Sequence, residues 1–268
     1  MRRPPFKNQI FILWACIIFT NTMSGLEAYE TEALYAELQR RYSCLNKPTG
    51  NFIFMGAPGS GKGTQSLSLM KSHCYCHLST GDILRSAINK GDPIGMEAKK
   101  HMDQGRLVPD SVVLKLVENK INTEQCSRGF ILDGFPRTDV QAKGLHKLLE
   151  SVGKKINGVL LFECPDEEIE KRITGRLVHV PSGRVYHKVT RPPKVPMKDD
   201  ITNEPLIQRK DDSLEVIRTR LAAYHKQTEP LSKYYDGLGL LHRFNANRPE
   251  GELKADIDKY LSKNGDKA

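Results

Sequence analysis

From residue 50 onwards, short apolar runs alternate with longer segments of helical periodicity. Five short, mainly apolar runs, each of strand length, occur at residues 52–55, 76–78, 130–132, 159–162 and 240–244. Apolar residues recur at helical spacing between them, in residues 65–71, 82–89, 94–104, 111–122, 139–151, 166–174 and 214–235. This alternation predicts an α/β fold, with a five-stranded parallel sheet covered by helices on both faces.

Two segments do not follow the alternation. In residues 30–42, Leu34, Leu38 and Tyr42 share one side of a predicted helix that we expect to pack outside the main core. Residues 175–212 are rich in proline, lysine and β-forming residues and are too long for a plain loop. We predict that they form a small inserted domain, a β-hairpin lid.

The composition is typical of a globular enzyme with an anionic partner. The 268 residues suit one large domain with insertions, and the formal net charge is +9. Between residues 170 and 220, twelve Lys and Arg stand against seven Asp and Glu. Such an excess suits a nucleic-acid surface or a cover over nucleotide phosphates. The six cysteines show no C-x-x-C pair, so we predict reduced, mostly buried thiols in an intracellular protein.

The first 22 residues have the shape of a secretory signal. Arg2, Arg3 and Lys7 precede an apolar run at residues 10–19, which is shorter than the roughly 20 residues that a membrane span needs. No good small-x-small cleavage site follows, and Met23 would be a normal cytosolic start. Two interpretations stay open, a dispensable or untranslated leader and a true targeting signal, and the segment is left out of the fold prediction.

The most informative motif is a glycine-rich loop between a predicted strand and a predicted helix. Residues 56–64 read Gly-Ala-Pro-Gly-Ser-Gly-Lys-Gly-Thr. This G-x-x-x-x-G-K spacing is typical of a phosphate-binding loop, in which backbone N–H groups and a helix N-terminus surround the phosphates. Lys62 would reach the β- and γ-phosphates. Gly63 occupies the usual Ser/Thr position, and Thr64 comes one residue later.

A second strand also ends in a candidate functional residue. Asp133 follows the apolar run at 130–132, and Arg137 comes four residues later. A carboxylate at the carboxyl edge of the sheet, beside a phosphate loop, can hold Mg²⁺ or its water shell. A helix cap is the alternative for an isolated aspartate, but Lys62 in the same chain favours the metal.

Five separated motifs together resemble the adenylate kinase family in its long-lid form, over roughly residues 40–265. They lie at residues 56–65, 78–85, 105–110, 129–137, and 179–187 with 209–212. The resemblance implies the P-loop nucleoside monophosphate kinase fold and the reaction Mg²⁺-ATP + AMP giving two ADP. It also implies a kinase core at 49–265 with a monophosphate-binding insertion at 79–108 and a lid at 175–212. The residue patterns described above place a leader at 1–28 and an extension helix at 29–48 before this core.

The resemblance assigns roles by position. For the donor ATP it implies Gly59, Ser60, Gly61, Lys62, Gly63, Thr64, Arg172, Arg176, Val185, Tyr186 and Arg248. For the acceptor AMP it implies Thr80, Arg85, Arg106, Leu107, Val108, Gly134, Phe135, Pro136, Arg137, Gln141, Arg209 and Arg220, with Gln141 reading the adenine edge. The catalytic set is Lys62, Asp133, Arg137, Arg176, Arg209 and Arg220. Phosphoryl transfer depends on positioning and charge neutralisation, for which planar guanidinium groups are well suited.

The resemblance also bears on metals and location. Some members fix the lid with a zinc ion bound by four cysteines, but residues 175–212 contain none. His179, Ser182, Asp199 and Thr202 stand at the ligand positions, which implies a hydrogen-bonded network and no structural metal. Mg²⁺ enters with the nucleotide. We expect a cytoplasmic monomer without a stable membrane span, or a protein of the mitochondrial intermembrane space or secretory pathway if the leader acts as a signal.

Two alternative functions remain at this point. One is a kinase of another nucleoside monophosphate, or one that uses GTP as donor; Thr80, Gln141 and the Arg209-Lys210 pair favour AMP and ATP. The other is a non-catalytic nucleotide-binding protein or a basic nucleic-acid partner. In a protein of that class we would expect some of the catalytic residues to be missing. Its basic residues would form stripes interleaved with aromatic residues. We therefore expect ATP, AMP and ADP as ligands and no nucleic acid.

Overall fold

The computed structural model describes residues 30–104 and 106–266, and the chain divides into two units, residues 1–46 and 47–268. The described part of the first unit is helix α2 (Thr31–Leu45), in which Glu37 pairs with Arg40 at 2.7 Å and Arg41 at 2.9 Å. This confirms the predicted helix, while the leader at 1–28 lies outside the described residues. Among the residues described, no helix is long and apolar enough to cross a membrane.

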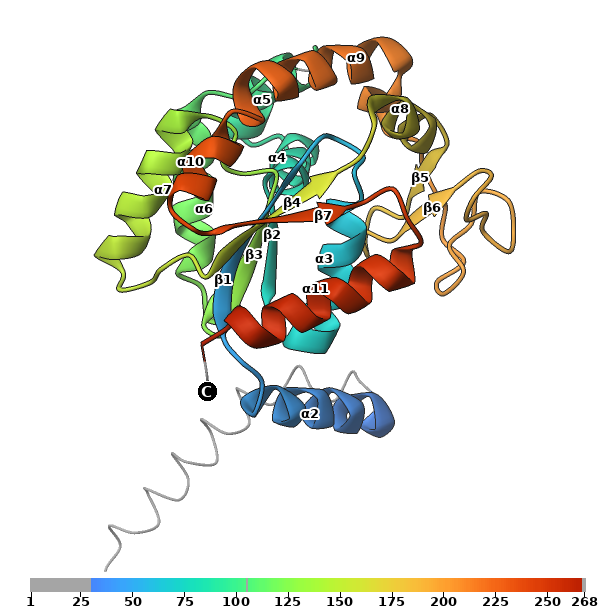
Figure 1. The fold of residues 1–268 in the computed structure, drawn as a ribbon. Coiled ribbons are helices and arrows are strands. Elements are labelled where there is room, and N and C mark those ends of the chain that lie inside the picture. Colours follow the sequence, from blue (N-terminus) through green and yellow to red (C-terminus); the bar gives the residue numbers. More distant parts are fainter. Residues whose placement is uncertain (1–29, 105, 267–268) are drawn as a thin grey trace, which may run out of the picture. The chain divides into compact units, whose positions relative to one another are not determined.

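The second unit contains a five-stranded parallel sheet with strand order β2-β3-β1-β4-β7 (Figure 1). The strands are β1 (Gly50–Gly56), β2 (Cys76–Ser79), β3 (Gly129–Asp133), β4 (Gly158–Glu163) and β7 (Leu241–Asn245). All five predicted strands are therefore confirmed, and every neighbouring pair is parallel.

Both faces of the sheet are buried because successive side chains of a strand point to opposite faces. In β1, Phe52 and Phe54 belong to a core cluster with α11 (Glu250–Asn264), whereas Ile53 and Met55 belong to a second cluster with α6 (Asp110–Ile121) and α7 (Asp139–Ser151). This explains why the strands are continuous apolar runs, as is typical of a parallel sheet covered on both sides.

The other helices lie near the predicted positions. They are α3 (Lys62–His73), α4 (Thr80–Asn89), α5 (Pro93–Met102), α8 (Asp166–Thr174), α9 (Leu214–Ala223) and α10 (Leu231–Gly237), with short 3₁₀ turns at Glu124–Cys126 and Lys210–Asp212. The single helix predicted for 214–235 was wrong, because a π-helical turn, Tyr224–Thr228, and Pro230 separate α9 from α10. Helix α11 was not predicted.

The segment predicted as a lid contains a β-hairpin. Strand β5 (Arg176–Val178) pairs antiparallel with β6 (Val185–His187). Beside them, Asp199 is fully buried and accepts hydrogen bonds from Arg184 Nε at 2.8 Å and Tyr186 Oη at 2.9 Å. His179 contacts Ser182 Oγ through Nδ1 at 2.7 Å. A polar network thus ties this segment together, and its residues include all four that the sequence predicted for it, Thr202 among them.

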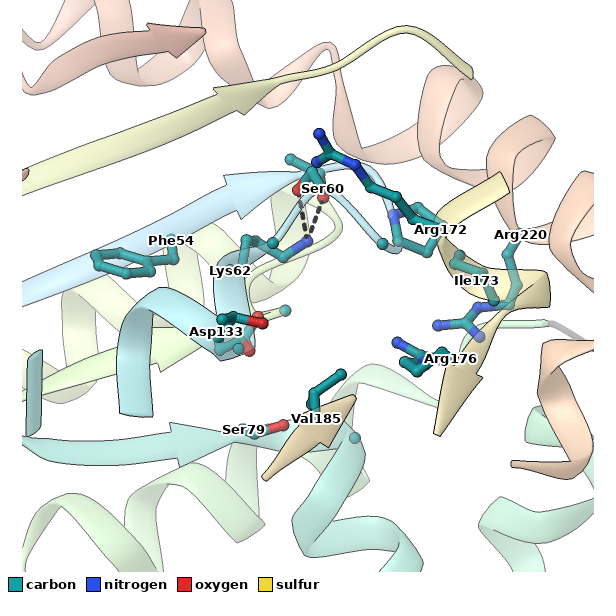
Figure 2. A pocket seen from close by; sticks show the side chains of 18 of the residues that line it. Phe54, Ser60, Lys62, Ser79, Asp133, Arg172, Ile173, Arg176, Val185 and Arg220 are labelled. Atoms are coloured by element: carbon teal, nitrogen blue, oxygen red, sulfur yellow. Dashed lines mark hydrogen bonds between the residues drawn. The ribbon is translucent and has the colours of Figure 1, made fainter. Parts of the chain in front are cut away.

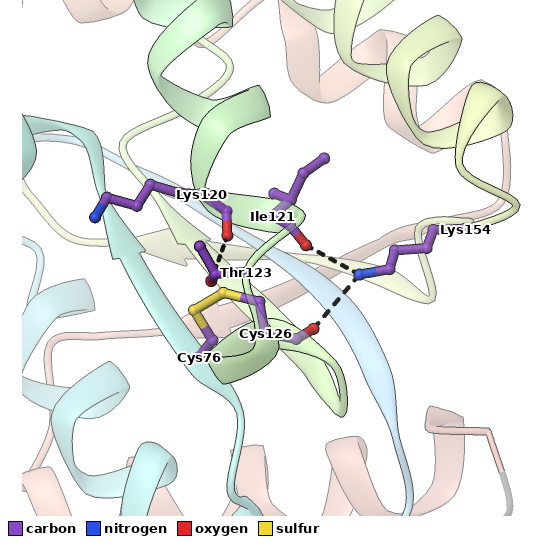
Figure 3. Close-up of a disulfide and its surroundings, with 6 residues drawn as sticks. All are labelled: Cys76, Lys120, Ile121, Thr123, Cys126 and Lys154. Atoms are coloured by element: carbon purple, nitrogen blue, oxygen red, sulfur yellow. Dashed lines mark hydrogen bonds between the residues drawn. A yellow bond between two sulfur atoms is a disulfide. The ribbon is translucent and has the colours of Figure 1, made fainter. Parts of the chain in front are cut away.

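The prediction of reduced thiols was wrong, as Cys76 and Cys126 show. Cys76, at the start of β2, is joined to Cys126 by a disulfide, with a Cα–Cα distance of 4.9 Å (Figure 3). The two residues are 50 positions apart, so no local spacing indicates the pair. The fold brings them together because β2 and β3 are parallel neighbours. Cys76 lies opposite Phe130 in their register, and Phe130 follows Cys126 closely in the chain. The cysteine pattern therefore no longer supports a reducing compartment.

We predict that this disulfide is present in the purified protein. When free thiols are alkylated under denaturing, non-reducing conditions, the tryptic peptide with Cys126 should remain linked to the peptide that contains Cys76, and the link should be lost in Cys126→Ser. Cys164, a free cysteine in the structure, is the internal control and should be alkylated. Quantitative alkylation of Cys126 would contradict the pairing.

Candidate active site

The glycine-rich loop joins β1 to α3 and requires its glycines for both conformation and space. Gly59 has φ +83°, and a Cβ there would lie 2.6 Å from Ile173 Cδ1. Gly61, with φ 97°, caps the N-terminus of α3, which starts at Lys62. The loop therefore presents a helix N-terminus and its free N–H groups, which together attract anions.

Lys62 lies at the centre of this loop. Its Nζ donates hydrogen bonds to the carbonyl oxygens of Gly56 and Ala57, both at 2.8 Å, and lies 3.4 Å from Ser60 Oγ (Figure 2). Burial lowers the pKa of the ammonium to about 8, and the charges of Arg137 and other arginines act in the same direction against the attraction of Asp133. A negatively charged ligand would oppose this shift and stabilise the protonated form.

Asp133 faces the loop because β1 and β3 are neighbours, with Phe54 opposite Asp133 in the register. A Cβ at Gly63 would lie 3.4 Å from Asp133 Oδ2, an ordinary contact distance, so this loop position lies directly beside the carboxylate. Burial raises the pKa of Asp133, but His77, with Nε2 at 3.5 Å from Oδ2, and the charge of Lys62 outweigh this effect and lower it overall. Asp133 is thus an ionised carboxylate beside the phosphate loop.

Four arginines are paired with aspartates around the same space. Arg176, at the start of β5, forms a bidentate pair with the fully buried Asp212. Arg220 of α9 donates to Asp211 Oδ2 at 2.9 Å. Asp82 of α4 accepts from both Arg85, at 2.6 Å, and Arg209, at 3.1 Å, although Arg209 is 127 positions away. The carboxylates were not predicted as site residues, although Asp82 lies in the motif that carries Arg85, and Asp211 and Asp212 lie in the motif that carries Arg209.

The arginine charges repel one another. Burial lowers the pKa of Arg209 to about 10, and the charges of Arg85 and Arg176 act in the same direction. The pKa of Arg220 is also lowered to about 10, again first by burial, with Asp211 opposing the shift. Guanidinium groups rarely lose any of their basicity in proteins. A cluster that disfavours its own positive charge to this extent is a strong site for a polyanion.

On the second side of the site, Thr80 and Arg137 meet the strand end. Thr80 Oγ1 donates to the carbonyl of Gly134 at 3.1 Å, and Arg137 Nε donates to the same oxygen at 2.7 Å. A Cβ at Gly134 would lie 2.9 Å from Arg137 Nη2, so the guanidinium packs closely against the glycine. Gln141 is buried, accepts from the Arg137 backbone N–H at 2.7 Å and donates to Asp110 Oδ1 at 2.7 Å.

Next to the phosphate loop, α3, α8 and the loop after β7 converge. Arg172 Nη2 donates to the carbonyl of Ala246 at 3.0 Å, and Gln65 Nε2 donates to that of Glu250 at 3.0 Å. Arg248 pairs with Asp256 at 2.6 Å. Gln65 was not predicted as a site residue; its only sequence signal is its place one residue after the phosphate loop.

One cavity of about 800 Å³ joins all these parts. Figure 2 shows Lys62 and Asp133 on one side of it and Arg172, Arg176 and Arg220 on the other. Every predicted site residue lines this cavity except Phe135, whose side chain is 1% exposed and packs in the core. Contact of Phe135 with a ligand could therefore come only from its main chain. His77, Asp82, Asp211 and Thr228 also line the cavity but were not predicted.

Comparison with known proteins supports the same family. The adenylate kinase family profile matches residues 54–240. Adenylate kinase 4 of Oryza sativa subsp. japonica is 48% identical over 239 residues, which cover 89% of this chain and 98% of the relative. Adenylate kinase 4 of Arabidopsis thaliana is 47% identical over 89% of this chain and 97% of the relative, and the adenylate kinase of Kluyveromyces lactis is 47% identical over 79% and 94%.

The chain belongs to the adenylate kinase family. The predicted family and the P-loop nucleoside monophosphate kinase fold are confirmed. The chain is accordingly a phosphotransferase of the nucleoside monophosphate kinase class.

We predict that ATP affinity falls as the pH rises above about 8, because binding favours the ammonium form of Lys62, which the free protein loses in this range. Calorimetric titration with ATP between pH 7 and pH 9.5 measures the effect. Lys62→Arg keeps its charge throughout and should flatten the profile, although its affinity can differ at every pH. An equal fall in both proteins would assign the titration to another group.

Proposed function

We propose that this protein catalyses the reversible, Mg²⁺-dependent transfer of the γ-phosphoryl group of ATP to AMP, giving two ADP, and so balances the adenine nucleotide pool. The observation that carries the proposal is the convergence of five buried or half-buried cations on one cavity beside an ionised carboxylate. They are Lys62, Arg137, Arg176, Arg209 and Arg220.

The reaction needs little covalent help from the protein. An oxygen of the AMP phosphate forms a bond to the γ-phosphorus while the bond from that phosphorus to the β–γ bridging oxygen breaks, which leaves ADP on each side. The AMP phosphate is already ionised at neutral pH, so no general base is required. Catalysis then depends on alignment and on stabilising the charge of the equatorial oxygens, which the guanidinium groups and Lys62 supply.

The donor nucleotide would lie along the phosphate loop. The N–H groups of residues 59–64 would hold the phosphates, with Lys62 at the transferring end. Arg172 and Arg248 would flank the adenine, and Val185 and Tyr186 would approach it from the lid hairpin. The Tyr186 hydroxyl already bonds Asp199, so only its ring is free for this role.

The acceptor would lie between α4 and the end of β3. Arg85 and Arg137 would hold its phosphate, and Thr80 and the main chain at 106–108 would surround the base. Gln141 would read the adenine edge, using the amide hydrogen and lone pair that its bonds to Asp110 and Arg137 leave over.

Mg²⁺ fits the residues on this side of the cavity. Asp133 is an ionised oxygen donor beside the phosphate loop, and Mg²⁺ in nucleotide sites commonly binds one or two carboxylates, water and phosphate oxygens. The ion would neutralise charge on the β- and γ-phosphates. Among the described residues, including those of the lid network, no group of three His, Cys, Asp or Glu is placed to hold a metal ion by itself.

Ligand binding should also rearrange the ion pairs. The guanidinium groups that would bind the phosphates already form ion pairs with Asp82, Asp211 and Asp212. The phosphates must therefore displace these carboxylates or share the arginines with them. Because of this exchange, the lid at 175–212 and the insertion at 79–108 would contact the ligand better in a closed conformation than in an open one. Closure upon binding requires such a difference in affinity between the two conformations. Closure would exclude water from the transferring group.

The cytoplasmic location and the monomeric state stay predictions. The absence of a spanning helix among the described residues bears on neither, and the leader lies outside them.

We predict that Lys62→Ala abolishes phosphoryl transfer while the protein stays folded, since no other ammonium group lies in the phosphate loop. A coupled assay over a panel of monophosphate acceptors and triphosphate donors measures the loss, and circular dichroism checks the fold. Lys115→Ala, on α6, is the matched control and should be fully active. Turnover by Lys62→Ala close to that of the parent would refute the role. The proposed reaction would be refuted if the wild-type protein phosphorylated another acceptor and not AMP, or phosphorylated no acceptor.

We predict that a bisubstrate mimic, two adenosines joined by five phosphates, makes the protein more compact and binds far more tightly than ATP or AMP alone. Small-angle scattering with and without the mimic measures compaction, and calorimetry measures affinity. Arg176→Ala should weaken both effects because Arg176 links the lid hairpin to the phosphates. Lys194→Ala, at an exposed lid lysine that does not line the cavity, is the control. Identical dimensions with and without the mimic would favour a rigid nucleotide-binding module.

A further inference from the structure

The π-helical turn after α9 carries a residue of the cavity that the proposed reaction does not use. In this turn, Tyr224–Thr228, the N–H of Glu229 bonds the carbonyl of Tyr224 at 2.9 Å. In a continuous α-helix, residues 220 and 228 would point about 80° apart. The wider turn reduces this angle, so that Thr228 lines the same cavity as Arg220.

Thr228 contacts the other side of the cavity through one hydrogen bond. Its hydroxyl donates to the backbone carbonyl of Arg137 at 3.2 Å, and the residue is 7% exposed. The N–H of Arg137 is held by Gln141 Oε1 at 2.7 Å. The main-chain N–H and C=O of Arg137 are therefore both hydrogen-bonded, the N–H to Gln141 of α7 and the C=O to Thr228 of the π turn.

The Arg137 side chain has little freedom once its main chain is fixed. Its Nε donates to Gly134, and its Nη2 fills the space beside the glycine Cα. The resulting guanidinium position lies close enough for its charge to lower the pKa of both Lys62 and Arg220. A displacement of the Arg137 main chain would move this charge relative to both neighbours.

We propose that Thr228 is a positioning residue, whose hydroxyl ties the segment that carries Arg137 to the helix that carries Arg220. The π turn is then the feature that sets the separation of two phosphate-binding cations supplied by distant parts of the chain. The proposal rests on the proposed function, because it assigns Arg137 and Arg220 to the transferring phosphoryl group. Thr228 touches no reacting atom in this role.

The test removes the hydroxyl and asks whether the effect passes through Arg137. Thr228→Val keeps the shape and should lower kcat/KM for AMP on the order of 10- to 100-fold, as for a misplaced catalytic group. Thr228→Ser should restore most of the activity. In an Arg137→Lys background, Thr228→Val should add little further loss, because residues that act as a unit are not additive. ATP affinity should stay unchanged in each Thr228 variant.

Thr219→Val is the matched control, since the Thr219 hydroxyl is exposed and bonds only within α9. If Thr228→Val does not fold, the pair Thr228→Ser and Thr228→Ala makes the same comparison at smaller volume. Wild-type activity in Thr228→Val, or an equal fold-loss in both Arg137 backgrounds, would overturn the proposal while the proposed reaction stands. A wild-type protein that does not phosphorylate AMP would overturn the proposed function itself.

Discussion

Positive charge gathered in a poorly solvated cavity is the constraint on which this structure depends. Positive side chains from the phosphate loop, the end of β3, the segment before α9 and α9 itself face one cavity, where burial and then their like charge make each harder to protonate. The protein tolerates this because carboxylates from α4 and the turn before α9 pair with most of the guanidinium groups. A polyphosphate offers more charge than these carboxylates, which is the physical reason to expect tight binding and rearrangement together.

The parallel sheet makes this convergence achievable. Neighbouring parallel strands end at the same edge, so the pairing of β1 with β3 brings the phosphate loop and Asp133 together although Lys62 and Asp133 are 71 positions apart. Alternate apolar side chains of the strands pack against helices on the two faces of the sheet and hold that edge in place. The site is thus held by a rigid core, while the lid hairpin and α4 contribute the parts that we expect to move.

Small irregularities refine the arrangement that the sheet makes possible. The π turn directs Thr228 into the cavity, and the Arg137 guanidinium packs closely against Gly134. In the lid, buried Asp199 organises the hairpin through Arg184 and Tyr186. Each is a local departure from the regular pattern that has a partner on another element.

The sequence by itself determined the strands, most of the helices, the phosphate loop and the cations, because these depend on local periodicity and on motifs of contiguous residues. It did not determine the pairing of Cys76 with Cys126, the break of the helix at residue 224, or the aspartate partners of the arginines. Those features join residues far apart in the chain, or depend on how a helix must turn to reach a distant carbonyl. Strand order and helix packing alone bring such residues together, so only the tertiary structure decided them.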